Sequence, residues 1–74
     1  MEQEIARSLM GEIAELNAKL NEIATTIERI GSDDERRTMR LGVANMMGHA
    51  YQELMRPIVA QYPGLDPDRG ELSR

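Results

Sequence analysis

The segment IARSLMGEIAELNAKLNEIATTIERI, residues 5–30, decides the fold of this 74-residue chain. Its large apolar side chains recur at alternating spacings of three and four residues, and no proline interrupts them. This spacing is a heptad repeat, whose a and d positions form one apolar seam along a helix. The a positions are Ala6, Ile13, Leu20 and Ile27, and the d positions are Leu9, Leu16, Ile23 and Ile30. The segment predicts a long helix over residues 2–30.

The positions beside this seam favour a helical bundle over a simple two-stranded coiled coil. In a two-stranded coiled coil the e and g positions usually carry charges. Here most of these positions are small, apolar or neutral. The full set is Ile5, Met10, Glu12, Asn17, Lys19, Ala24 and Thr26. The buried stripe is therefore expected to be wider than a single seam.

A short turn and a second helix are predicted after residue 30. Gly31 is able to take the positive φ that often ends a helix, and Ser32 with Glu35 has the spacing of a capping box. The second helix is expected over residues 34–61, with a kink near Pro57, because proline removes one backbone hydrogen bond. A connection this short joins antiparallel neighbours, so residues 1–62 are predicted to form an αα-hairpin.

The second helix has more apolar surface than one neighbour covers, since its apolar positions span over half of its circumference. We therefore expect an all-α fold in which two antiparallel hairpins dimerise into a four-helix bundle. Residues 63–74 contain Pro63, Gly64 and Pro67 and are expected to form a non-helical tail. The residues predicted to form the core and oligomer interface are Leu9, Ile13, Leu16, Leu20, Ile23, Ile27, Val43, Met47, Tyr51, Leu54 and Ile58.

The composition narrows the possible function. The chain has no cysteine, one histidine and a net charge of −4. Disulfides and thiolate metal sites are excluded, and a zinc site made by one chain is not expected, so a small core is expected to gain its stability by oligomerisation. The acidic balance and the absence of Phe and Trp argue against nucleic-acid binding. No nucleophile elbow, phosphate loop or EF-hand loop is present, so no enzyme activity, cofactor or metal is expected.

The sequence predicts no association with a membrane. No apolar run approaches about 18 residues, and the first ten residues have neither a basic nor an apolar section typical of a signal peptide. A cytoplasmic location is the corresponding expectation.

Two clusters of polar side chains suggest other functions. Arg36, Arg37 and Arg40 lie at the predicted hairpin tip and could contact an anion or an RNA phosphate, although neighbouring carboxylates are expected to pair with them. His49 and Glu53 share a helix face, and a two-fold axis could bring His49 to its copy in a small-molecule or metal site. A solvated histidine beside a glutamate is the simpler interpretation, because two ligands do not make a metal site.

The leading hypothesis from the sequence is a small non-enzymatic interaction protein. It would act as an adaptor, regulator or subunit, as a homodimer, and would present a helical surface or its tail to a protein partner. The first alternative is a nucleic-acid-associated regulator that uses the arginine tip, and the second is the site near His49.

Overall fold

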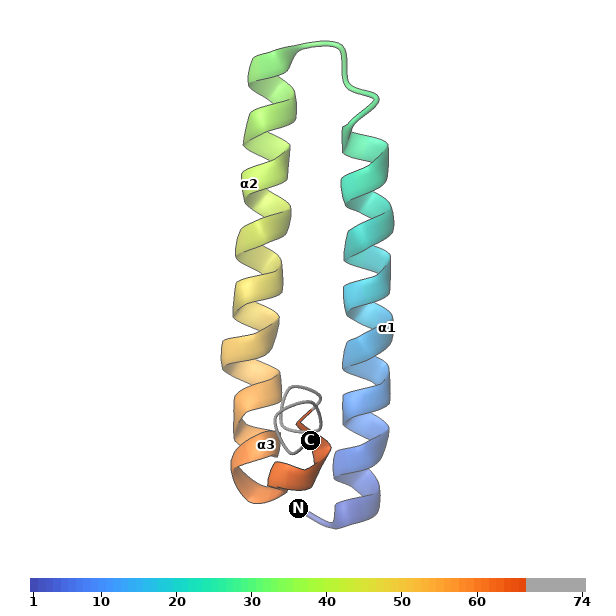
Figure 1. Cartoon of the computed structure of the whole chain (residues 1–74), viewed down its shortest axis with the longest axis vertical. Coiled ribbons are helices and arrows are strands. Elements are labelled where there is room, and N and C mark those ends of the chain that lie inside the picture. The colour runs from blue at the N-terminus through green and yellow to red at the C-terminus, as the bar shows by residue number, and fades with distance from the viewer. Residues whose placement is uncertain (67–74) are drawn as a thin grey trace, which may run out of the picture.

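The computed structural model describes residues 1–66, and these residues form helices, turns and no strand. Helix α1 (Gln3–Ile27) is followed by α2 (Asp33–Ala50), a π-helical turn (Tyr51–Met55), α3 (Arg56–Gln61) and a short 3-10 turn (Pro63–Leu65). Figure 1 shows α1 lying antiparallel to α2 and α3. The predicted helical hairpin is confirmed, and the part of the predicted tail from residue 67 lies outside the described residues.

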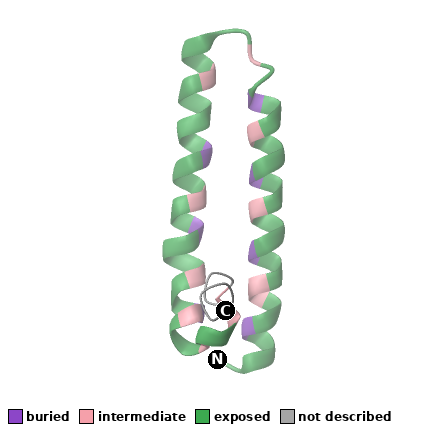
Figure 2. Ribbon diagram, in the orientation of Figure 1, coloured by how far each residue is buried: buried purple, intermediate pink, exposed green. Residues whose placement is uncertain are grey.

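The core of the hairpin is the a seam of α1. All four a residues are buried, and so are Val43, Ala50 and Ile58 on the opposite helices. Figure 2 shows the buried positions facing one another across the hairpin. The heptad spacing explains this, because residues seven apart return to the same face of a helix and meet the neighbouring helix along its whole length.

The turn between the helices differs from the prediction at its first residues. Helix α1 ends at Ile27. The chain then makes a tighter turn, in which the Ile30 amide donates to the carbonyl of Ile27, three residues earlier, at 3.0 Å. Gly31 does not take positive φ, so the predicted left-handed glycine cap is wrong. The Ser32 cap is confirmed, since its hydroxyl accepts from the Glu35 amide at 3.3 Å and satisfies a free donor of the first turn of α2.

A π-helical turn shifts the register of the chain before Pro57. Proline has no amide hydrogen, so the Glu53 carbonyl lacks the partner that an α-helix would supply four residues later. The turn over Tyr51–Met55 accommodates this by widening the helix by one residue. Val43 and Ala50 are buried seven residues apart, and the next buried residue, Ile58, follows after eight. The extra residue places Ile58 in the core where a strict heptad would place Pro57.

The core consists of two clusters along the hairpin. One contains Ala6, Ile13 and Ile58 near the open end, and the other contains Leu20, Ile27 and Val43 near the tip. At the open end the Tyr62 hydroxyl donates to the Met1 carbonyl, and the amino group of Met1 donates to the side chain of Gln61 at 3.1 Å. These contacts tie the start of α1 to the end of α3.

The hairpin is one layer of helices thick. It measures 45 × 27 × 16 Å, and its radius of gyration is 15.1 Å, whereas a compact chain of this length has about 11 Å. Its accessible surface of 5745 Å² is about a quarter larger than the roughly 4,600 Å² expected for a compact monomer of its mass. Domains usually contain two packed layers, and the described part of this chain forms one.

The side-chain amide of Asn17 is expected to lower the stability of the hairpin. Its Oδ1 atom is buried and has no hydrogen-bond partner within residues 1–66. Burying an unpaired amide oxygen costs about 1–3 kcal/mol, so Asn17→Leu is expected to raise the free energy of unfolding by about 1 kcal/mol. Urea denaturation of the wild type and the variant measures the difference. Asn21→Leu, at an exposed position of the same helix, is the matched control, and an equal gain in both variants would contradict the explanation.

Candidate functional site

One face of the hairpin carries large apolar side chains that the fold leaves in solvent. The d residues Leu16 and Ile23 of α1 are each 40% exposed, in contrast to the buried a residues. Across the hairpin, Met39 and Leu54 are each 48% exposed and Met46 is 56% exposed. These side chains cannot be covered by the hairpin itself because its two helices already meet along the a seam.

These side chains form three rungs that cross the hairpin, and we call the set the apolar ladder. The first rung, Leu9 with Leu54, lines a groove of about 400 Å³ near the open end. The middle rung, Leu16 with Met46, lines one of about 310 Å³, and the tip rung, Ile23 with Met39, lines one of about 440 Å³. The first two grooves share Leu16 and Leu54, so the apolar surface is continuous there. The apolar ladder consists of Leu9, Leu16, Ile23, Met39, Met46 and Leu54.

The residues predicted to form the core and interface separate into two groups in the structure. Ile13, Leu20, Ile27, Val43 and Ile58 are buried inside the hairpin. The rest are at least partly accessible: Leu9 and Met47 are half-buried, and Leu16, Ile23, Tyr51 and Leu54 are exposed.

Met39 and Met46 belong to the wide apolar face predicted for the second helix, but they were not among the residues predicted to form the core and oligomer interface. They lie seven residues apart, and each lies four residues before a buried residue, Val43 and Ala50 respectively. That heptad spacing on the second helix was the signal that could have identified them.

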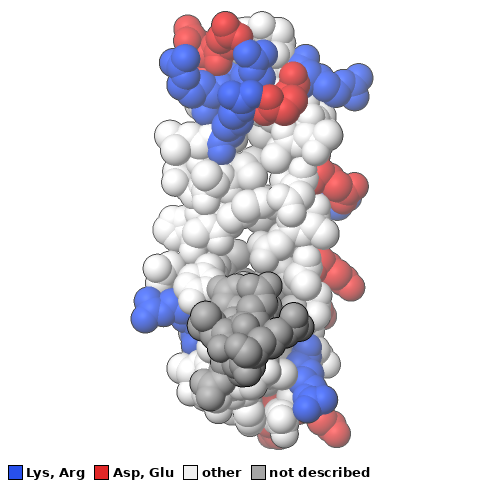
Figure 3. Space-filling model, viewed as in Figure 1, with Lys and Arg blue, Asp and Glu red and all other residues white. Residues whose placement is uncertain are grey.

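The arginine cluster at the hairpin tip is paired with carboxylates. Arg36 donates to the Ile30 carbonyl at 2.9 Å and also binds Asp33. Arg37 lies 4.0 Å from Asp34. Figure 3 shows basic and acidic side chains intermixed at this end of the molecule. The sequence prediction that neighbouring carboxylates pair with the arginines is confirmed, and a phosphate would have to displace them.

Arg40 makes the contact that joins the two helices at the tip. Its Nε donates to Oε2 of Glu28 at 2.6 Å, and its Nη2 also donates to that carboxylate, which gives a two-point contact. The hydrogen bond from Arg40 holds the pKa of Glu28 below its ordinary value of 4.5 and raises the pKa of Arg40. The fold therefore favours the ionised carboxylate.

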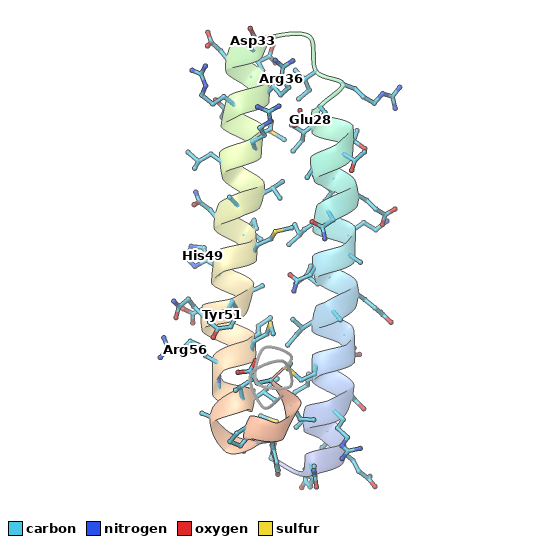
Figure 4. The ribbon with its side chains drawn as sticks, in the orientation of Figure 1. Glu28, Asp33, Arg36, His49, Tyr51 and Arg56 are labelled. Atoms are coloured by element: carbon cyan, nitrogen blue, oxygen red, sulfur yellow. The ribbon has the colours of Figure 1, made fainter. Side chains whose placement is uncertain are left out.

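His49 lies beside the apolar ladder and points away from α1 (Figure 4). It lines the groove of the middle rung together with Met46 and Glu53. Within residues 1–66, no three histidine or acidic side chains gather in an arrangement that could hold a metal ion. His49 and Glu53 therefore form a polar edge of this apolar groove.

Two further observations bear on function. In the part of the chain that the structure describes, no helix is both long enough and apolar enough to cross a membrane. Compared with models of protein families, with characterised proteins and with solved structures, the chain matches none of them.

The Glu28–Arg40 contact predicts a pH dependence of stability. Because the pKa of Glu28 is lowered in the fold, the contact stabilises the protein above about pH 4.5, and this contribution is lost as the pH falls below that value. Arg40→Gln is expected to lower the melting temperature at neutral pH, and its difference from the wild type should shrink as the pH falls below 4.5. Thermal unfolding followed by circular dichroism measures both.

Arg37→Gln is the control for this experiment, since Arg37 and Asp34 are largely exposed and 4.0 Å apart. It should change the melting temperature little at any pH. A deficit of Arg40→Gln that stays constant down to acid pH would contradict the assigned role of Glu28.

Proposed function

We propose that the protein is a small non-enzymatic interaction module, an adaptor, regulator or subunit, whose hairpins pair through the apolar ladder. Pairing converts two single layers into an intermolecular four-helix bundle. The remaining surface of the bundle is then available to a protein partner. The apolar ladder is the observation that supports this proposal, because five of its six side chains are 40% exposed or more, and large apolar side chains gathered on one face mark interaction sites.

The energetics favour a reversible dimer. Burying the exposed half of each ladder side chain contributes roughly 1 kcal/mol, so two copies of the six residues contribute on the order of 12 kcal/mol. Association costs about 4–15 kcal/mol in lost freedom of motion. The gain and the cost are of similar size, so the dimer is expected to form in a concentration-dependent way.

The area also fits a dimer. One partner in a standard interface buries about 800 Å². The chain exposes 5745 Å², which is about 1,100 Å² more than a compact monomer of its mass, so an interface of that size would remove most of the excess. The pairing of Arg36, Arg37 and Arg40 with carboxylates gives the nucleic-acid alternative no comparable support.

Light scattering coupled to gel filtration over a concentration series tests the proposal. The mass is expected to rise from the 8.4 kDa of one chain toward twice that value as the concentration enters the micromolar range. Met46→Glu places a charge on the middle rung and should keep the protein monomeric, while circular dichroism checks that it stays helical.

The matched control is Leu41→Glu. Leu41 is 61% exposed and lines none of the three grooves of the apolar ladder, so the same change in charge there should leave the dimer intact. A wild-type protein that stays a folded monomer throughout the series would overturn the proposal.

A further inference from the structure

The apolar ladder has an internal symmetry about its middle rung. On α1, Leu9 and Ile23 lie seven residues before and after Leu16. On the other side, Met39 lies seven residues before Met46, and Leu54 lies eight after it, because the π-helical turn adds one residue. The outer rungs are thus each about 10 Å from the middle rung along the helices.

This symmetry matters for how a second copy can lie on the face. Consider a two-fold axis that lies in the interface, perpendicular to both helices, and passes beside the middle rung. This axis places the first rung of one copy on the tip rung of the other. Leu16 and Met46 then meet their own copies. Every apolar rung of one copy therefore packs on an apolar rung of the other, as the self-complementary interface of a symmetric dimer requires.

Two hairpins can stack with their tips at the same end or at opposite ends, and the charges along the face favour one of these two arrangements. The groove of the first rung contains two carboxylates, Glu12 and Glu53. The groove of the tip rung contains Lys19 together with Glu22. If both tips pointed the same way, first rung would lie on first rung, and four carboxylates would gather at one end of the interface. Like charges brought together in this way oppose binding.

Stacking with the tips at opposite ends instead gathers three carboxylates, Glu12, Glu53 and Glu22, with one lysine, Lys19, at each end. Glu12 lies four residues before Leu16 and Lys19 lies three residues after it. When α1 of one chain runs antiparallel to α1 of the other about Leu16, Glu12 comes level with Lys19 of the second copy, and the pair occurs twice. In the single chain Lys19 contacts Glu22 at 3.3 Å, but both side chains are about two-thirds exposed, so that contact is weak and easily exchanged.

We infer that the occupant of the apolar ladder is a second copy of this chain, bound with its tip at the opposite end. In this arrangement α1 packs on α1 of the second copy about Leu16, and Glu12 pairs with Lys19 across the interface. The inference rests on the proposed dimer and specifies its orientation and register.

Engineered cysteines test the orientation, since the natural chain has none. Leu16→Cys lies beside the axis and is expected to form a disulfide-linked dimer on mild oxidation. Leu9→Cys and Ile23→Cys each place the cysteine about 10 Å from the axis, and therefore about 20 Å from its own copy, too far for a disulfide. Neither should link alone, but an equal mixture of the two should yield the mixed dimer.

Charge reversal provides a second test that no covalent bond can bias. Glu12→Lys and Lys19→Glu should each raise the dissociation constant roughly threefold to tenfold, because each loses two ion pairs and gains two repulsions. The double variant restores both pairs and should bind as the wild type does. With the tips at the same end, Glu12→Lys would instead tighten the dimer by relieving the repulsion with Glu53.

Light scattering on the reduced samples separates failure of the orientation from failure of the proposed function. A dimer whose cysteines do not link in the expected pattern, or that Glu12→Lys tightens, overturns the orientation and leaves the proposed function standing. Cysteine variants and wild type that are all monomeric overturn both.

Discussion

The structure depends on one contact, the meeting of the a seam of α1 with Val43, Ala50 and Ile58. Nothing else inside the described chain buries a comparable apolar surface. A seam of this kind uses one of the two apolar positions in each heptad, so the d positions are left at its edge. The exposure of Leu16 and Ile23 is therefore a direct consequence of the way the hairpin closes.

The geometry of two helices explains why the exposed side chains gather on one face. In an antiparallel pair the d residues of α1 lie to one side of the seam, and Met39, Met46 and Leu54 lie to the same side, as the shared grooves show. Two helices alone cannot enclose that side. The apolar ladder and the single-layer thickness of the hairpin are two aspects of the same constraint, and the second layer that we propose would cover the ladder and thicken the fold.

The π-helical turn connects the local chemistry of Pro57 with this face. A regular α-helix through residues 51–58 would direct Pro57 toward the core and Glu53 to the position of the first rung. The one-residue shift brings Ile58 into the core and Leu54 onto the apolar ladder. The side of the helix that faces the core and the side that carries the ladder therefore both stay apolar as far as the open end of the hairpin. The tip is held differently: Arg36 donates a hydrogen bond to the Ile30 carbonyl, and the ion pair of Arg40 with Glu28 joins α2 to the end of α1.

The sequence by itself determined the hairpin. The heptads, Ser32 and the short turn were sufficient because helix periodicity and capping are local properties. Only the tertiary structure decided which apolar positions close the hairpin and which remain in solvent. In the sequence Leu16 and Ile13 are equivalent, since both belong to one seam, and Met39 and Met46 are not distinguished from the other apolar positions of the second helix. Their roles depend on the rotation of each helix about its axis and on the register shift before Pro57, and both are settled by packing between segments far apart in the chain.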